Sequence, residues 1–220
     1  VTGDSWTGHG DAGDRTDPTD EAAVRARVRR VVGHERMLGV RLYAALEYAE
    51  FPTELDRRGD WIRDDALEPV FEELVAQNAA LYVFPKAEQL WHVATVAEEY
   101  PDLSVVVDHM AFPDGTTAPD DAPWTDFERV AERGNTYVKV SSLPRSAERE
   151  YPYPDLHGYV QNLLEWFGPE RLMLGSDYPW MDDWADYGEC LRWVEEVDWL
   201  SARDAAYLEY RTFERLHDSN

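Results

Sequence analysis

Short apolar runs rich in β-branched residues recur along this chain and alternate with longer helical patterns. The strand-like runs lie at 39–43, 81–84, 104–109, 136–140 and 171–176. The helical patterns lie at 21–34, 67–77, 90–99, 124–132 and 156–167, and a final pair follows at 187–197 and 202–216. Because helices separate successive strands, the strands are expected to run in the same direction, with both faces of their sheet covered. The sequence predicts an α/β fold built on five parallel strands.

Polar side chains interrupt or follow these apolar runs near the end of each strand. They are Arg41 and Tyr43 in the first run, Lys86 after the second, Asp108 and His109 in the third, Lys139, Ser141 and Ser142 in or after the fourth, and Ser176 and Asp177 at the end of the fifth. Two long loops, at 44–64 and 112–123, also follow strands. The carboxyl ends of parallel strands meet at one edge of the sheet, where α/β proteins bind their substrates. We therefore expect these side chains to converge.

His109 and Asp177 form the most informative pair in this set. Side chains alternate between the two faces of a strand, so His109 is expected on the face of Val105 and Val107, and Asp177 on the face of Met173. If both faces point into a barrel, an imidazole and a carboxylate meet above its core. Such a pair binds a divalent metal ion, or it supplies a general base and an electrostatic partner for an attacking water.

Structural interpretations of the same residues stay open. His109 is also compatible with a hydrogen-bonded structural histidine, and Asp177, which Tyr-Pro follows, with a turn that accepts backbone N–H groups. Arg41 within an apolar strand needs a partner, which is either a protein carboxylate or an anionic substrate. Lys139 carries a similar ambiguity, because its stem can run along the core while its amine reaches water. Trp180 follows Asp177 closely and is placed to form a pocket wall.

The charge balance excludes two classes of partner. The 220 residues include 45 Asp and Glu against 21 Lys and Arg, which gives a formal net charge of −24. Such a surface repels nucleic acids and acidic lipid headgroups, so neither is an expected partner. Only Lys86 and Lys139 among the basic residues are lysines. An acidic, lysine-poor surface suits high salt, where screening removes most of the self-repulsion; an acidic protein adapted to ordinary salt is the alternative.

The N-terminal segment and the single cysteine bear on location. Residues 1–20 are rich in Gly, Asp and Thr and are typical of a loop or disordered leader, ahead of one domain at 21–220. Cys190 is the only cysteine, which excludes an intramolecular disulfide and favours a reducing compartment. No apolar run reaches the roughly 18 residues that a membrane span requires, and no secretory signal pattern is present. We expect a cytoplasmic protein.

Four stretches of the chain carry a recognisable family pattern. They read GVRL at 39–42, PDLSVVVDHM at 101–110, NTYVKVSSL at 135–143 and RLMLGSDYP at 171–179. In order and spacing they resemble the amidohydrolase-related branch of the metal-dependent hydrolases, the amidohydrolase 2 group. The resemblance implies a (β/α)8 TIM barrel whose strands four to eight are the five runs above, with His109 ending strand six and Asp177 ending strand eight. Members of this group include lactonases and non-oxidative decarboxylases, and some need zinc or a similar ion.

The sequence departs from this pattern in its N-terminal part. The family begins with a strand that ends in His-x-His and supplies two metal ligands, and no His-x-His occurs in this chain. Because 38 residues precede Gly39, strands one to three are expected to be absent and the barrel N-terminally incomplete. Three explanations stay open: a truncated product, which we favour, strands supplied from elsewhere, and an open five-stranded sheet. Exposed sheet edges would favour a homo-oligomer or association with another chain.

The resemblance predicts hydrolysis of a lactone or ester bond in a small anionic substrate. Asp177 is the predicted general base, and His109 the predicted metal ligand or polarising group. A divalent metal such as zinc would have only these two ligands, so its site is expected to be incomplete. The residues predicted to bind the substrate are Arg41, Tyr43, Lys139, Ser142 and Trp180, with Arg41 and Lys139 binding a carboxylate. The alternatives are non-oxidative decarboxylation and a non-catalytic remnant that needs a partner segment.

Overall fold

Five parallel strands form one sheet in the computed structural model, which describes residues 20–34, 36–43, 60–113 and 117–217. The strands follow one another across the sheet in chain order, and each pairs in parallel with the next. They are β1 Gly39–Tyr43, β2 Ala80–Phe84, β3 Val105–Val107, β4 Thr136–Val140 and β5 Leu172–Leu174. The predicted parallel α/β arrangement is confirmed. Nearly all of the leader at 1–20 and most of the loop at 44–64 lie outside the described residues.

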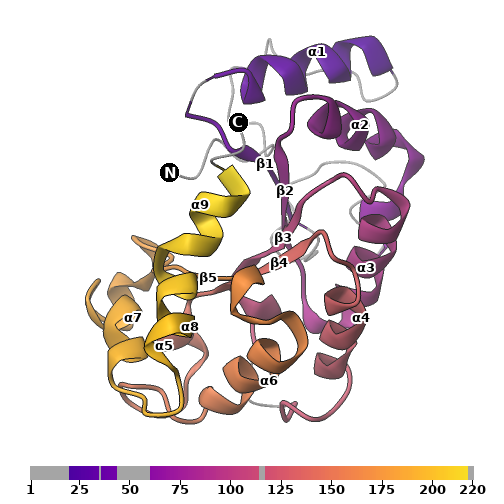
Figure 1. Cartoon of the computed structure of the whole chain (residues 1–220). Helices are drawn as coiled ribbons and strands as arrows, with labels where there is room; N and C mark the ends of the chain where they lie inside the picture. The colour runs from indigo at the N-terminus through magenta and orange to yellow at the C-terminus, as the bar shows by residue number, and fades with distance from the viewer. Residues whose placement is uncertain (1–19, 35, 44–59, 114–116, 218–220) are drawn as a thin grey trace.

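The helices connect the strands in the predicted order (Figure 1). They are α1 Glu21–Val32, α2 Glu68–Ala76, α3 Leu90–Glu99, α4 Phe127–Ala131, α5 Leu143–Ser146, α6 His157–Phe167, α7 Glu189–Arg192, α8 Ala202–Ala206 and α9 Thr212–His217. Asp20 caps the start of α1, because its carboxylate accepts a hydrogen bond from the backbone N–H of Ala23. A π-helical turn at Tyr207–Arg211 joins α8 to α9, so the predicted last helix at 202–216 is one continuous helical segment.

The main hydrophobic core lies between the sheet and helices α1, α2, α3, α4 and α6. Alternate strand residues point into this core and are buried, among them Leu42, Leu81, Val83, Val105, Val107, Val138 and Val140. Each fully buried side chain of this size contributes about 1.5–3 kcal/mol to stability. The apolar runs of the sequence therefore build the helix-covered face of the sheet.

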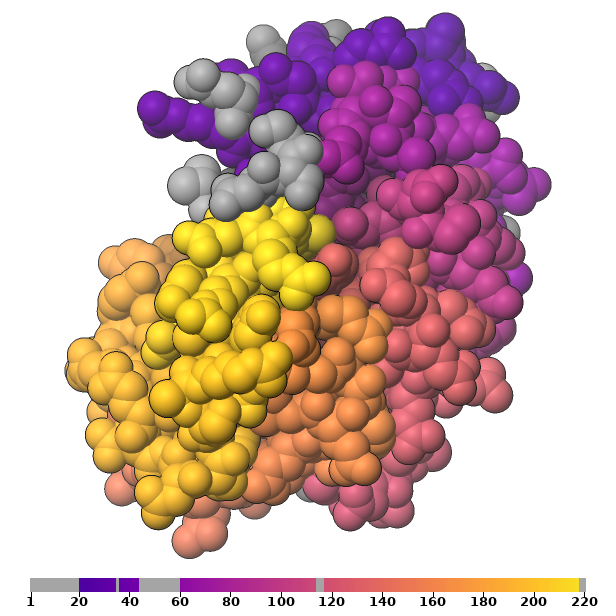
Figure 2. Space-filling model, in the orientation of Figure 1, coloured from indigo at the N-terminus to yellow at the C-terminus, as the bar shows by residue number. Residues whose placement is uncertain are grey.

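The opposite face of the sheet carries a smaller apolar cluster. It consists of Ala80, Tyr82, Val106 and Met173, and Leu216 of α9 packs against it. The Tyr82 hydroxyl lies 2.8 Å from Nε2 of His217, at the end of the same helix. Figure 2 shows the C-terminal segment, in yellow, lying across the surface on this side of the molecule. The last helix thus covers part of the face that the other helices leave open.

The alternation expected for β3 is wrong for His109. Val105 and Val107 belong to the helix-side core, whereas Val106 belongs to the opposite face. The strand ends at Val107, and the following turn at Asp108–Ala111 has left-handed backbone angles at His109 and Met110, each with φ of 53°. This turn, and not the alternation of a strand, brings the His109 ring to the open face.

Candidate active site

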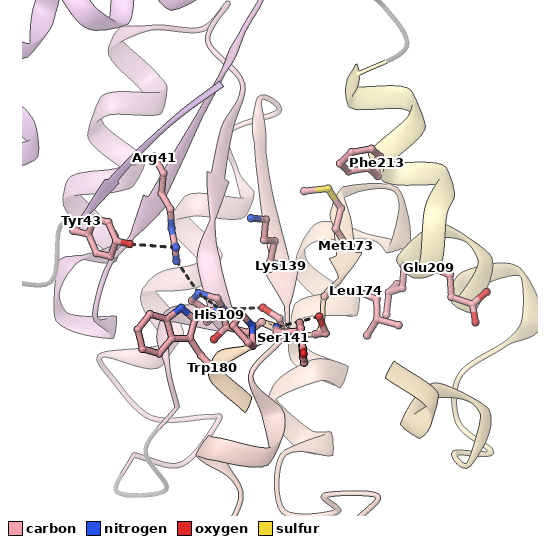
Figure 3. Close-up of a pocket in the computed structure, with 16 residues that line it drawn as sticks. Arg41, Tyr43, His109, Lys139, Ser141, Met173, Leu174, Trp180, Glu209 and Phe213 are labelled. Carbon is pink, nitrogen blue, oxygen red and sulfur yellow. Dashed lines mark hydrogen bonds and ion pairs between the residues drawn. The ribbon is translucent and has the colours of Figure 1, made fainter. Parts of the chain in front are cut away.

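A cavity of about 630 Å³ opens at the carboxyl ends of the strands, on the face opposite the main core. Side chains from β1, from the turn after β3, from β4 and from the segment after β5 line it, and the C-terminal helix adds one wall (Figure 3). The predicted residues among these are Arg41, Tyr43, His109, Lys139, Asp177 and Trp180, and the C-terminal helix contributes Leu208, Glu209 and Phe213. The convergence predicted for these strand ends is therefore present.

Asp108 forms the charged centre beneath this cavity. Its side chain is fully buried, and its two carboxylate oxygens pair with different cations. Nε of Arg41 donates to Oδ2 at 2.6 Å, and Nζ of Lys139 lies 2.8 Å from Oδ1. Burial raises the pKa of Asp108, but the positive charges of Lys139 and Arg41 outweigh this effect and hold the pKa below its usual value. Asp108 is therefore an ionised carboxylate that orders both cations.

His109 is neutral near pH 7. Burial of the ring lowers its pKa to about 4, although the nearby carboxylates of Asp108 and Asp177 act in the opposite direction. Its Nε2 lies 2.8 Å from Nη2 of Arg41, and its Nδ1 lies within 3.0 Å of the hydroxyls of Ser141 and Ser142. All of its polar contacts are thus to protein groups at the floor of the cavity.

Asp177 comes directly after β5 and reaches the same floor. Its backbone φ of 57° is left-handed, which turns the chain sharply at this position. The Ser142 hydroxyl donates to Oδ2 at 2.6 Å, and Oδ1 lies 3.7 Å from Nε2 of His109. The predicted meeting of an imidazole and a carboxylate therefore occurs, in a site partly shielded from water.

Aromatic rings surround these polar groups. The guanidinium of Arg41 lies 5.0 Å from the centre of the Tyr43 ring, and Phe84 packs edge-on against both Tyr43 and His109. Trp180 lies at the mouth of the cavity with 76% of its surface exposed. A planar or ring-shaped ligand would find apolar contact surfaces here beside fixed charges.

The described residues do not fit a catalytic metal ion. They contain no group of three or more His, Cys, Asp or Glu side chains that could hold one. In addition, Nε2 of His109, the ring nitrogen that lies 3.7 Å from Oδ1 of Asp177, faces the guanidinium of Arg41 at 2.8 Å. A cationic side chain therefore already occupies the space in front of this nitrogen.

Two parts of the site differ from what the sequence suggested. Ser142 is 1% exposed and lies behind the cavity wall, because its left-handed backbone, with φ of 62°, turns the hydroxyl toward Asp177. This position offers a contact to the Asp177 carboxylate and not the expected direct contact to a substrate. The sequence also suggested no role for Asp108. Asp108 lies two residues after Val106, so the alternation of side chains along a strand predicts it on the cavity face, to which Val106 belongs.

Comparisons with known proteins give the family. The amidohydrolase family model matches residues 15–209. An L-fucono-1,5-lactonase of Burkholderia ambifaria is 33% identical over 143 residues, which cover 62% of this chain and 48% of that protein. The chain thus spans about half the length of this curated relative. None of the helices in the described part of the chain is long and apolar enough to cross a membrane.

Solved structures show the same fold. An amidohydrolase of Burkholderia multivorans has a TM-score of 0.67 and 26% identity, with 89% of this chain and 71% of that chain covered, and another crystal structure of it contains bound zinc. A probable 2-pyrone-4,6-dicarboxylic acid hydrolase of Acinetobacter baumannii has a TM-score of 0.69 and 16% identity, covering 88% and 68%. The five strands correspond to part of a TIM barrel. This chain belongs to the amidohydrolase family.

Proposed function

We propose that this protein is a hydrolase that opens the lactone or ester bond of a small anionic substrate. The observation that carries the proposal is the position of Asp177, whose carboxylate lines the cavity beside a neutral imidazole and two cationic side chains. The similarity to a lactonase supports the same type of bond cleavage.

Asp177 acts as the general base in the proposed reaction. It takes one proton from a water molecule, and the oxygen of that water attacks the carbonyl carbon of the lactone. The tetrahedral intermediate then collapses, the ring C–O bond breaks, and the leaving oxygen takes the proton back from Asp177. Lactone and water are converted to a hydroxy acid, and Asp177 is regenerated as a carboxylate.

Arg41 and Lys139 supply the positive charge that the reaction requires. Together they carry two positive charges, and their shared partner Asp108 carries one negative charge, so this group retains a net charge of +1. Both side chains line the cavity. The remaining charge favours a substrate carboxylate, or the negative charge that develops on the carbonyl oxygen. Tyr43 and Trp180 provide the apolar walls.

Replacement of the base tests the proposal most directly. Asp177→Asn keeps the shape of the side chain but removes its basicity, and hydrolysis of a six-membered lactone should fall by about 1,000-fold or more. Asp182→Asn, at an exposed position just after the site, is the matched control and should retain activity. Full activity in Asp177→Asn would rule out the proposed base.

The same assay separates the two alternative functions. The wild-type chain is offered a 1,5-aldonolactone, a carboxylated six-membered lactone and a hydroxylated aromatic acid. Ring opening, measured as acid release, supports the hydrolase. Release of carbon dioxide from the aromatic acid would show a decarboxylase instead, and no turnover of any of the three would favour a chain that needs a partner segment.

The surface charge leads to a second proposal, on the medium in which the protein works. We propose a salt-rich cytoplasm, because a net charge of −24 on a chain with two lysines is strongly self-repelling unless it is screened. Thermal melting in roughly 0.1 M and 3 M KCl checks this expectation. The melting temperature should rise with salt, whereas a flat response would indicate an ordinary acidic protein.

A further inference from the structure

A continuous series of polar contacts crosses the floor of the cavity from Asp108 to Asp177. Asp108 pairs with Arg41, and Arg41 contacts His109 through its Nη2. On the other side of the ring, Nδ1 of His109 lies 3.0 Å from the hydroxyl of Ser142, which in turn lies 2.6 Å from Oδ2 of Asp177. The two carboxylates of the site are thus linked through three intervening side chains.

The chemistry of Arg41 fixes the direction of these hydrogen bonds. A guanidinium can only donate, so Nε2 of His109 must accept from Nη2 of Arg41. In the neutral ring the proton then resides on Nδ1, which donates to a serine oxygen. A hydroxyl that accepts this bond has its own proton free to donate, and Ser142 donates it to Asp177. Arg41 thus donates both to Asp108 and to His109, and every bond from Arg41 onward points toward the proposed base.

The two neighbouring serines differ in one contact. Both hydroxyls lie near Nδ1 of His109, at 2.9 Å for Ser141 and 3.0 Å for Ser142. Of the two, Ser142 is the one whose hydroxyl donates to Asp177. We propose that Ser142 is a positioning residue that orients the carboxylate of Asp177, and that the pair of Asp108 and Arg41 sets the His109 tautomer on which this orientation depends.

This arrangement assigns different tasks to the two oxygens of Asp177. Oδ2 is held by Ser142, which leaves Oδ1 available to a water in the cavity. A carboxylate with one oxygen fixed loses rotational freedom and presents the other oxygen in a defined direction. The inference rests on the proposed function in so far as it concerns catalysis, whereas the hydrogen-bond directions are independent of the reaction.

The matched pair Ser142→Ala and Ser141→Ala tests the positioning role. Each removes a hydroxyl next to His109, and the Ser142 variant also removes the donor to Asp177. Ser142→Ala should lower kcat for lactone hydrolysis by about 10- to 100-fold with KM changed less than about twofold, and Ser141→Ala should have a much smaller effect on kcat. Crystal structures should show the Asp177 carboxylate rotated in Ser142→Ala and unmoved in Ser141→Ala. Equal effects of the two substitutions, or an unmoved Asp177 in both, would overturn the proposal.

Nitrogen NMR of His109 tests the tautomer without any substrate. The wild-type ring should be protonated on Nδ1, and Asp108→Asn should abolish the single tautomer because Arg41 loses its anchor. Glu73→Gln is the control, since Glu73 is also a buried carboxylate with two hydrogen bonds from an arginine, Arg29, but lies on α2. It should leave the His109 signals unchanged. A proton on Nε2 in the wild-type protein would refute the inference. If the wild-type tautomer is as expected and Asp177 rotates in Ser142→Ala, but the protein does not hydrolyse lactones, only the proposed function is refuted.

Discussion

The two faces of the sheet are built on different principles. The helix-side face places Leu81, Val105 and Val138 in a fully buried apolar core. The cavity-side face alternates with it along the same strands and carries Arg41 and Lys139, both paired with the single carboxylate of Asp108. A substitution on the first face should therefore change the stability of the protein, and one on the second face should mainly change its chemistry. Neighbouring residues in one strand can have unrelated tasks.

The largest expected effect on stability comes from the helix-side face. Leu81→Ala removes a fully buried side chain of β2 and should lower the free energy of unfolding by roughly 4 kcal/mol, within the range measured for such cavities. Urea unfolding measures this change. KM for a lactone should stay within about twofold at a temperature where the variant is folded. A raised KM with unchanged stability would mean that the two faces do not have separate tasks.

The separation of the faces was only partly predictable from the sequence. The order and direction of the strands were predicted correctly, because short apolar runs separated by helices are typical of a parallel sheet. The strand ends were not: β3 was expected to reach His109 but ends at Val107. The left-handed angles at His109, Ser142 and Asp177 occur at residues other than glycine, so no sequence signal marked them.

The candidate site shows the same limit. His109, Arg41 and Lys139 were identified because a polar residue in an apolar strand is conspicuous. Asp108 was expected at the same edge of the sheet but was given no role, although it is the group that orders both cations. The wall formed by Phe213 could not be foreseen, because the contact of the C-terminal helix with β2 joins residues 135 positions apart, as the bond from Tyr82 shows.

Acid should destabilise the cavity-side face through His109. The unfolded chain binds a proton on this histidine near pH 6.5, whereas the folded chain binds it only near pH 4. Stability should be fully present above pH 6.5 and should fall by about 3 kcal/mol as the pH decreases to 4. Urea unfolding from pH 7 to pH 4 measures this loss. His109→Gln is the control, because a glutamine side chain binds no proton between pH 7 and pH 4. An equally steep loss of stability in this variant would assign the pH dependence to other groups.

The smallest expected effect concerns the C-terminal helix on the cavity-side face. Tyr82→Phe removes the hydroxyl that contacts His217 and should lower the free energy of unfolding by about 1 kcal/mol. The rings of Tyr82 and His217 are also stacked, with centres 6.4 Å apart, and this contact remains in the variant. Hydrogen exchange should therefore speed up in α9 while the amides of β2 keep their protection, because the main core is on the other side of the sheet. Equal acceleration in β2 would show that the helix is part of the same cooperative unit as the core, and the contrast between the two faces would then hold for chemistry but not for stability.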